Sequence, residues 1–185
     1  MGLISKMIGT YNVKYLSLEG EAATIGRVKL EMESYRSVHF ACHASQNSEK
    51  PLKSGFYLHD GRLELADIMK QKIARCDLAF LSACQTSAGD EKLSEEVVHL
   101  AAGMLAVGYR GVVATMWSIN DDYGPIVAES IYKYLVEKGT SPEKPRLDSA
   151  GSAYALHHAI QNIRERVGDT EQGLLMWVPY VHFGF

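Results

Sequence analysis

The stretch Asp77-Leu78-Ala79-Phe80-Leu81-Ser82-Ala83-Cys84 decides how the rest of this chain is interpreted. It is a short apolar run that starts after charged residues and is followed directly by turn-forming residues, from Gln85 to Asp90. A run of this length is too short for a helix and predicts a fully buried strand. Open α/β sheets place their chemistry at the carboxyl ends of their strands, so Cys84 stands where a reactive side chain is expected.

A second stretch, Ser37-Val38-His39-Phe40-Ala41-Cys42-His43, has the same form and predicts another buried strand, which ends on His43. His43 precedes Cys84 by 41 residues, about one strand–loop–helix–strand crossover. If the two strands are parallel neighbours, the imidazole and the thiol reach one cleft. On such a strand His39 shares a face with His43, whereas Cys42 lies on the opposite face.

Composition places the chain among ordinary soluble globular proteins. Its 185 residues suit one domain, 46% of them are hydrophobic and the formal charge is −3, which gives no support for nucleic-acid binding. No apolar run approaches the roughly 20 residues that span a bilayer, and the first residues lack the pattern of a signal peptide. Three cysteines, at 42, 76 and 84, argue against a disulfide framework and for a reducing, cytoplasmic compartment.

Strand and helix patterns alternate along the chain. Apolar spacing predicts a helix over 21–35, Asp60-Gly61 predicts a hairpin within 56–65, and Gly108 is expected to end a helix that starts at Ser94. The first dozen residues carry no clear pattern and could be a strand fragment. Further expected elements are a loop over 44–54, a helix over 65–74, a loop over 85–92, a strand over 111–116, a helix over 125–138, a loop over 140–146, a helix over 149–167 and a closing strand over 177–183. This alternation predicts an α/β sandwich with a mostly parallel sheet.

Four ordered blocks resemble the CHAT domain, a family grouped with caspases, separases and gingipains among the caspase-like cysteine peptidases. The resemblance runs from about Leu18 to the C-terminus and implies a caspase-like three-layer sandwich, with residues 1–185 forming a single domain. The blocks are Val38-His39-Phe40-Ala41-Cys42-His43, Phe80-Leu81-Ser82-Ala83-Cys84-Gln85-Thr86, Val113-Ala114-Thr115-Met116-Trp117-Ser118-Ile119-Asn120-Asp121 and Trp177-Val178-Pro179-Tyr180-Val181-His182-Phe183-Gly184.

The resemblance implies a catalytic dyad of His43 and Cys84, without a metal or a cofactor. In caspases the histidine precedes the cysteine by about 50 residues, which is compatible with this order and spacing. In such enzymes the sulfur attacks a peptide carbonyl to form an acyl-enzyme, and the histidine assists proton transfer to the leaving amine. Backbone N–H groups of Cys84 and of Ala44, just after the histidine, would hold the oxyanion.

The same resemblance implies a substrate pocket beyond the third strand. The block from Met116 to Asp121 is similar to the Leu-Trp-Asp-Val-Thr-Asp pattern of separases, whose last aspartate is associated with binding an arginine before the scissile bond. Asp121 inherits this role, which suits a carboxylate that pairs with a guanidinium. Ser82 and Trp117 complete the expected substrate-binding set. In the alternative interpretation, Asp121 or Asp122 only caps the helix that Pro125 opens.

Two departures from the family bear on activity. The family commonly has glycine after the histidine, whereas this chain has Ala44; if that position needs a positive φ angle, alanine costs about 1 kcal/mol. The chain also looks short at its front, where CHAT domains usually carry another strand. The expected partner is a protein or peptide substrate. CHAT domains are often attached to helical repeats, so such repeats in a longer parent protein are a possible regulatory partner.

Other interpretations stay open at this point. A caspase-like fold could serve as a non-catalytic interaction domain, with Ala44 marking relaxed chemistry. A zinc site could be drawn from His39, Cys42, His43 and Cys84, although no Cys-x-x-Cys pair anchors it. Cys42 and Cys76 are more simply small buried hydrophobic residues. Neither a dinucleotide-binding nor a phosphate-binding glycine motif occurs in the sequence.

Overall fold

The computed structural model of the chain describes residues 2–47, 49–71, 73, 75–82, 84–85, 93–117, 119, 122–139 and 146–185. For residues 2–3, 84–85 and 93–98 the description is limited to the backbone. The chain divides into two compact units. One comprises Leu18–Ser118 with Phe183–Phe185, and the other comprises Met1–Ser17 with Ile119–His182. Helices flank a mostly parallel sheet, so the predicted α/β class is confirmed.

The first sheet contains the buried strands that the sequence predicted. Its order is β1 (Val38–Phe40), β5 (Leu78–Leu81), β7 (Gly111–Thr115) and β8 (Tyr180–Gly184), and β5 is parallel to both β1 and β7. Every residue of β5 and β7 is buried. The end of β8 lies beside the start of β7, since the Phe185 N–H donates to the Arg110 carbonyl at 3.1 Å.

A second sheet has the order β4 (Gly61–Glu64), β3 (Gly55–Leu58), β2 (His43–Ser45) and β6 (Cys84–Gln85). Strands β3 and β4 form the predicted hairpin, and Gly61 has a φ of 147°, which L side chains rarely adopt. The hairpin turn also anchors a helix. The Asp60 carboxylate accepts a hydrogen bond from the backbone N–H of Ile25 at 2.8 Å, at the start of α2 (Ile25–Ser34).

The expectation of two uninterrupted strands, over 37–43 and 77–84, is wrong. The first is divided into β1 and β2, with Ala41 and Cys42 between them, and the second into β5 and β6. The continuations β2 and β6 leave the first sheet and pair with each other in parallel within the second. The predicted loop over 44–54 therefore begins with strand residues, and it also contains a 3₁₀ turn at Pro51–Lys53. Small residues without glycine or proline occupy both breaks, so the sequence carried no turn signal there.

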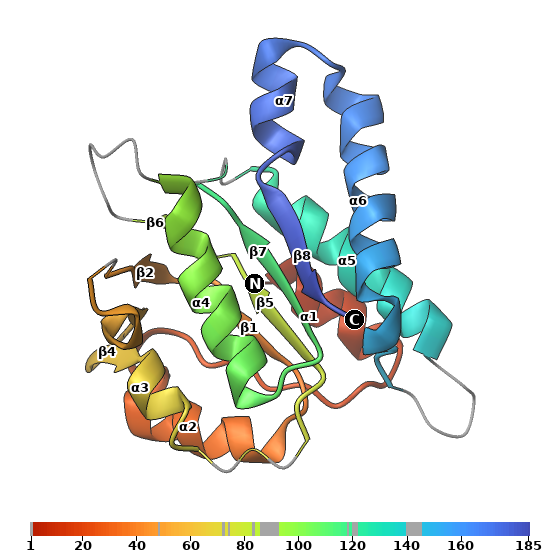
Figure 1. Cartoon of the computed structure of the whole chain (residues 1–185). Helices are drawn as coiled ribbons and strands as arrows, with labels where there is room; N and C mark the ends of the chain where they lie inside the picture. Colours follow the sequence, from red (N-terminus) through yellow and green to blue (C-terminus); the bar gives the residue numbers. More distant parts are fainter. Residues whose placement is uncertain are drawn as a thin grey trace. The chain divides into compact units, whose positions relative to one another are not determined.

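Helices complete the first unit. The helix α2 is shorter than the predicted 21–35 and follows a 3₁₀ turn at Gly20–Ala22, and α3 (Leu65–Ile68) is shorter than the predicted 65–74. The helix α4 (Leu93–Val107) ends before Gly108, as predicted, and contacts β7 (Figure 1). Gly103 allows a close approach, because a Cβ there would lie only 2.7 Å from the Leu65 side chain.

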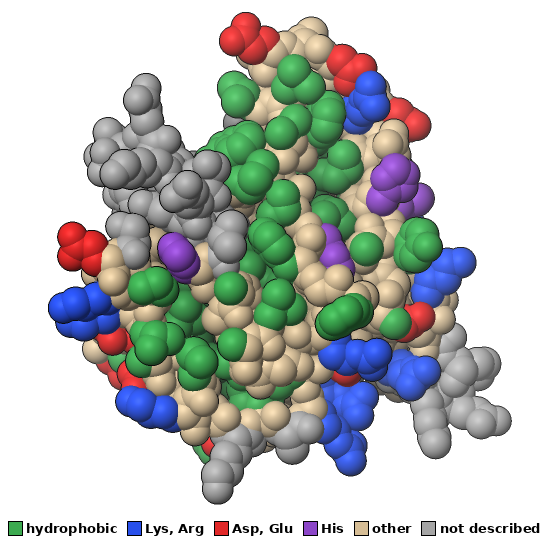
Figure 2. Space-filling model, in the orientation of Figure 1, with side chains coloured by type: hydrophobic (Ala, Val, Ile, Leu, Met, Phe, Trp, Pro, Cys, Tyr) green, Lys and Arg blue, Asp and Glu red, His purple; other side chains and the backbone are tan. Residues whose placement is uncertain are grey.

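The second unit is helical. The helix α1 (Gly2–Thr10), in a segment where the sequence carries no clear pattern, contacts α5 (Gly124–Gly139), and α5 contacts α6 (Ser152–Val167). Pro125 in the first turn of α5 and the end of α6 at Val167 agree with the predictions, although a 3₁₀ turn at Ser149–Gly151 precedes α6. The closing strand was predicted over 177–183, but Trp177 is the last residue of the final helix α7 (Glu171–Trp177), and the strand β8 begins only at Tyr180. Figure 2 shows hydrophobic side chains gathered over α7, where Leu174, Leu175 and Val178 are exposed.

Candidate active site

The two residues of the predicted dyad lie in register on neighbouring strands. In the parallel pairing of β2 with β6, His43 is opposite Cys84 and Ala44 is opposite Gln85. Neighbouring strands of a sheet lie about 4.8 Å apart, so the two backbones meet at this position. The His43 side chain is exposed. The backbone therefore places the predicted histidine and cysteine side by side. They lie on β2 and β6, the strands that follow β1 and β5 along the chain.

A buried layer beneath β2 fixes the register of β2 against β3. Ala44, Phe56 and Leu63 are opposite one another across β2, β3 and β4, and all three are fully buried. The Phe56 ring also stacks on Phe40 of β1, with ring centroids 4.1 Å apart and an interplanar angle of 7°. A shift of one residue would expose this apolar layer and bury His43, so packing strongly disfavours it.

Ala44 does not carry the strain that the missing glycine suggested. It lies inside β2 and does not adopt a positive φ angle. Its methyl group belongs to the buried layer, where it is completely shielded from solvent. Alanine is therefore well suited to this position, and the expected cost of about 1 kcal/mol does not arise.

His39, four residues before His43, lies in a different environment. It belongs to β1, opposite Phe80 of β5, and its ring stacks on the Phe80 ring at 4.4 Å between centroids. Its Nε2 and the Ser82 Oγ are 2.7 Å apart in a hydrogen bond. Burial lowers the pKa of His39 to about 4, so the ring is neutral at pH 7. The expected common strand face for His39 and His43 is wrong, because the break at 41–42 separates them into different strands.

The remaining predicted substrate residues are only partly placed. Ser82 directly follows β5, and its hydroxyl is engaged with His39. Trp117 lies two residues beyond the end of β7 and is partly exposed. Asp121 lies outside the described residues, so the pocket predicted beside it stays a prediction, as does its alternative role as a helix cap.

The sequence model of the CHAT domain matches residues 3–185, nearly the whole chain and both compact units. The chain belongs to the CHAT domain family. This family is related to caspase-like cysteine proteases, which agrees with the resemblance found in the motifs. No curated protein gives a significant sequence match.

The other two cysteines of this CHAT domain differ in their exposure. Cys76 is buried, and burial together with the neighbouring Asp77 carboxylate raises the pKa of its thiol, which keeps it protonated. Cys42 lies at the bend between β1 and β2 and is partly exposed, so the expectation that it is a buried hydrophobic residue is only partly met. Cys84 is the cysteine that pairs in register with His43, and it stays the predicted nucleophile.

The alternative zinc site has no support among the residues that the structure describes. Within the described part of the chain, no three His, Cys, Asp or Glu side chains gather in a way that could hold a metal ion. His39, one of the four residues drawn into the alternative zinc site, directs its Nε2 to Ser82. The helices that the structure describes do not have the length and apolarity needed to cross a membrane.

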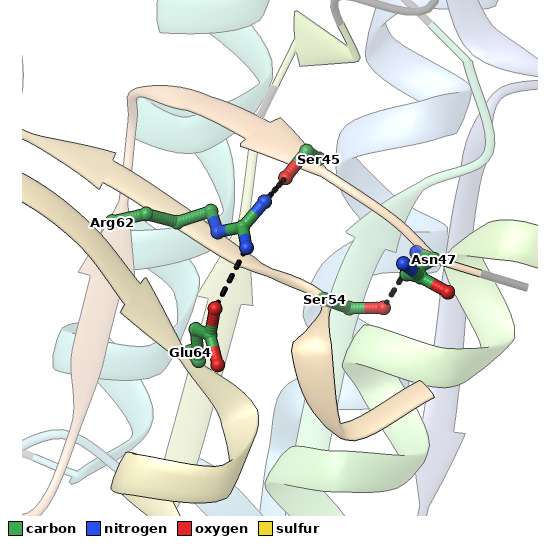
Figure 3. A network of polar contacts seen from close by, with 5 residues as sticks. All are labelled: Ser45, Asn47, Ser54, Arg62 and Glu64. Atoms are coloured by element: carbon green, nitrogen blue, oxygen red, sulfur yellow. Dashed lines mark hydrogen bonds and ion pairs between the residues drawn. The ribbon is translucent and has the colours of Figure 1, made fainter. Parts of the chain in front are cut away.

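A polar cluster beside His43 was missed at the sequence level. Arg62 of β4 bonds to Ser45 of β2 at 3.3 Å and to Glu64 at 2.7 Å, and Figure 3 shows its guanidinium between them. Next to it, the backbone N–H of Asn47 donates to the buried Ser54 Oγ at 3.0 Å. Alternation of polar and apolar residues in the hairpin was the available signal, but only the pairing of β2 with β3 brings Ser45 to Arg62.

Proposed function

We propose that this CHAT domain is a cysteine endopeptidase in which Cys84 is the nucleophile and His43 is the general acid and base. The observation that carries the proposal is the register of β2 and β6, which sets His43 opposite Cys84. A nucleophile and a base on adjacent strands are held more rigidly than residues on loops, which favours catalysis. The exposed position of His43 suits a polypeptide substrate that approaches from solvent.

The proposed reaction proceeds in two steps. The Cys84 thiolate attacks the carbonyl carbon of the scissile bond, the C–N bond breaks, and His43 delivers the proton that the leaving amine needs. Water then attacks the thioester with His43 as the base, and the carboxylic acid product leaves while the thiol is restored. Backbone N–H groups of Cys84 and Ala44 are the proposed donors to the oxyanion.

Cleavage is proposed to follow a basic residue. Asp121 would pair with the guanidinium or ammonium group of that residue, and Trp117 and Ser82 would border its side chain. Support comes from the family membership and from the position of Trp117 just after β7. Replacing Asp121 by alanine should reduce cleavage after arginine more than it reduces labelling by a small thiol reagent; equal losses would contradict the pocket assignment.

The test is covalent labelling with an electrophilic peptide that ends in arginine, followed by mass spectrometry of the modified residue. Labelling is expected at Cys84 in the unmodified protein and should be lost in Cys84→Ala and strongly reduced in His43→Ala. Cys76→Ala and His59→Ala are matched controls. Cys76 is a buried cysteine, and His59 is an exposed histidine in the turn between β3 and β4. Both controls should be labelled normally.

The same proteins are then assayed for hydrolysis of a peptide with arginine before the scissile bond. Cleavage that survives in Cys84→Ala would contradict the proposal. A protein that is neither labelled nor active on peptides would favour the alternative function, a non-catalytic interaction domain.

A further inference from the structure

The exposed face of the second sheet continues from His43 across two more strands. Side chains alternate strictly in this sheet, with Ala44, Phe56 and Leu63 buried on one face. The opposite face therefore carries His43 and Ser45 on β2, Tyr57 on β3, and Arg62 and Glu64 on β4. Because the strand order is β6, β2, β3, β4, this face extends from the His43 side of the dyad away from Cys84.

Four of these residues form one preorganised group, here called the Arg62 cluster: Ser45, Tyr57, Arg62 and Glu64. Arg62 connects β2 to β4 through its bonds to Ser45 and Glu64, and it is in register with Tyr57. Tyr57 remains 43% exposed. A hydrogen bond with Ser45, and further contacts with Arg62, lower the pKa of the Tyr57 hydroxyl. The cluster thus presents a fixed aromatic ring and a fixed guanidinium to solvent.

We propose that the Arg62 cluster binds the segment of the substrate that follows the scissile bond. This inference rests on the proposed peptidase function. In that reaction the acyl part stays on Cys84 while the amine leaves beside His43, so the leaving segment starts on the His43 side of the dyad. The next strands in that direction are β3 and β4.

Length and charge define the segment that fits. Two strand spacings from β2 to β4 amount to about 10 Å, which about three extended residues cover. Glu64 already balances the charge of Arg62, so the cluster suits an uncharged segment. Arginine has five N–H donors, and those not engaged with Ser45, Glu64 and Tyr57 suit backbone carbonyls of the substrate as partners. The Tyr57 ring suits an apolar or aromatic side chain.

Two substrates with the same residues before the scissile bond test the inference. One carries a fluorescent amine directly after arginine, and the other carries four uncharged residues and a quencher. For Tyr57→Ala and Arg62→Gln, the ratio of kcat/KM on the long substrate to that on the short one should fall about tenfold, mainly through KM. Arg36→Gln is the control, because Arg36 forms a comparable exposed pair with Asp77 outside this cluster, and it should keep the ratio.

Each other outcome overturns the inference. An unchanged ratio in both variants shows that the cluster does not contact the leaving segment. Equal losses on both substrates, with or without a lower unfolding midpoint, show that the cluster acts on the dyad or the fold instead. If the unmodified protein is labelled at Cys84 and cleaves only the short substrate, the dyad stands and the inference fails. If the unmodified protein is not labelled at Cys84 and cleaves neither substrate, both the proposed function and this inference are wrong.

Discussion

His39 and His43 are separated by three residues, yet the fold gives them opposite tasks. His39 lies in β1, where it is partly buried, stacks on the Phe80 ring and is hydrogen-bonded to Ser82. His43 lies in β2, exposed and opposite Cys84. The break at Ala41 and Cys42 creates this difference, because the chain passes there from the first sheet to the second sheet. One histidine therefore supports the fold, and the other is available for chemistry.

The largest expected effect is on catalysis. His43→Ala should reduce kcat/KM for peptide cleavage by about 1,000-fold, within the range that a general acid–base residue contributes. The free energy of unfolding should change by no more than about 0.5 kcal/mol, because the side chain is exposed. Steady-state kinetics and urea unfolding measure the two quantities. A His43→Ala variant with lower stability and unchanged activity would contradict the catalytic role proposed for His43.

His39→Ala should show the reverse pattern. It removes a stacked ring and leaves the Ser82 hydroxyl without its imidazole partner, so the free energy of unfolding should fall by about 3 kcal/mol. Urea unfolding provides the measurement. His39→Gln, which retains a hydrogen-bonding group, should lose less stability and keep most of the activity of the unmodified protein. A loss of about 0.5 kcal/mol or less, which is typical of surface substitutions, would show that His39 is not a structural residue.

Stability should also depend on pH through His39. Its pKa is about 4 in the folded state and 6.5 as the ordinary value, so below pH 6.5 the unfolded chain gains a proton that the folded chain does not take up. The free energy of unfolding therefore decreases as the pH is lowered, by about 2 kcal/mol from pH 7 to pH 5. Burial also lowers the pKa of His182 and acts in the same direction. The contribution of His39 is the difference in this pH dependence between the unmodified protein and His39→Gln; identical slopes would contradict it.

The smallest expected effect concerns the residue after His43. Ala44→Gly restores the residue that the family commonly has, yet it should destabilise the protein by about 1 kcal/mol, because Ala44 has no positive φ and its methyl group is buried. Peptide cleavage should not increase. Higher activity together with unchanged stability would indicate that glycine is needed there after all.

The parts of the fold that the sequence predicted well are governed by local signals. The apolar runs of β5 and β7, the Asp60-Gly61 hairpin and the end of α4 before Gly108 each carry their own pattern of burial or turn residues. The strand breaks after Phe40 and Leu81 depend instead on pairing with a hairpin elsewhere in the chain. The breaks contain no glycine or proline that would indicate a turn, so one strand was predicted for β1 and β2 together and one for β5 and β6 together.

The candidate site was predictable to a similar extent. Motif order was sufficient to select His43 and Cys84, which the structure places in register. It was not sufficient to separate the roles of His39 and Ser82, because their hydrogen bond forms between strands that are distant in sequence. The Arg62 cluster was missed for the same reason, since Ser45 and Arg62 meet only through β3.

The most direct test of the register is disulfide trapping. In a background with Cys42→Ser and Cys76→Ser, the His43→Cys variant is oxidised gently and its peptides are mapped by mass spectrometry. Strand neighbours in register have Cα atoms within the range of about 4.4–6.8 Å that disulfides need, so positions 43 and 84 should become linked. The matched His39→Cys variant should not link to position 84. A chain in which position 43 stays reduced, or in which position 39 links to position 84 instead, would contradict the dyad.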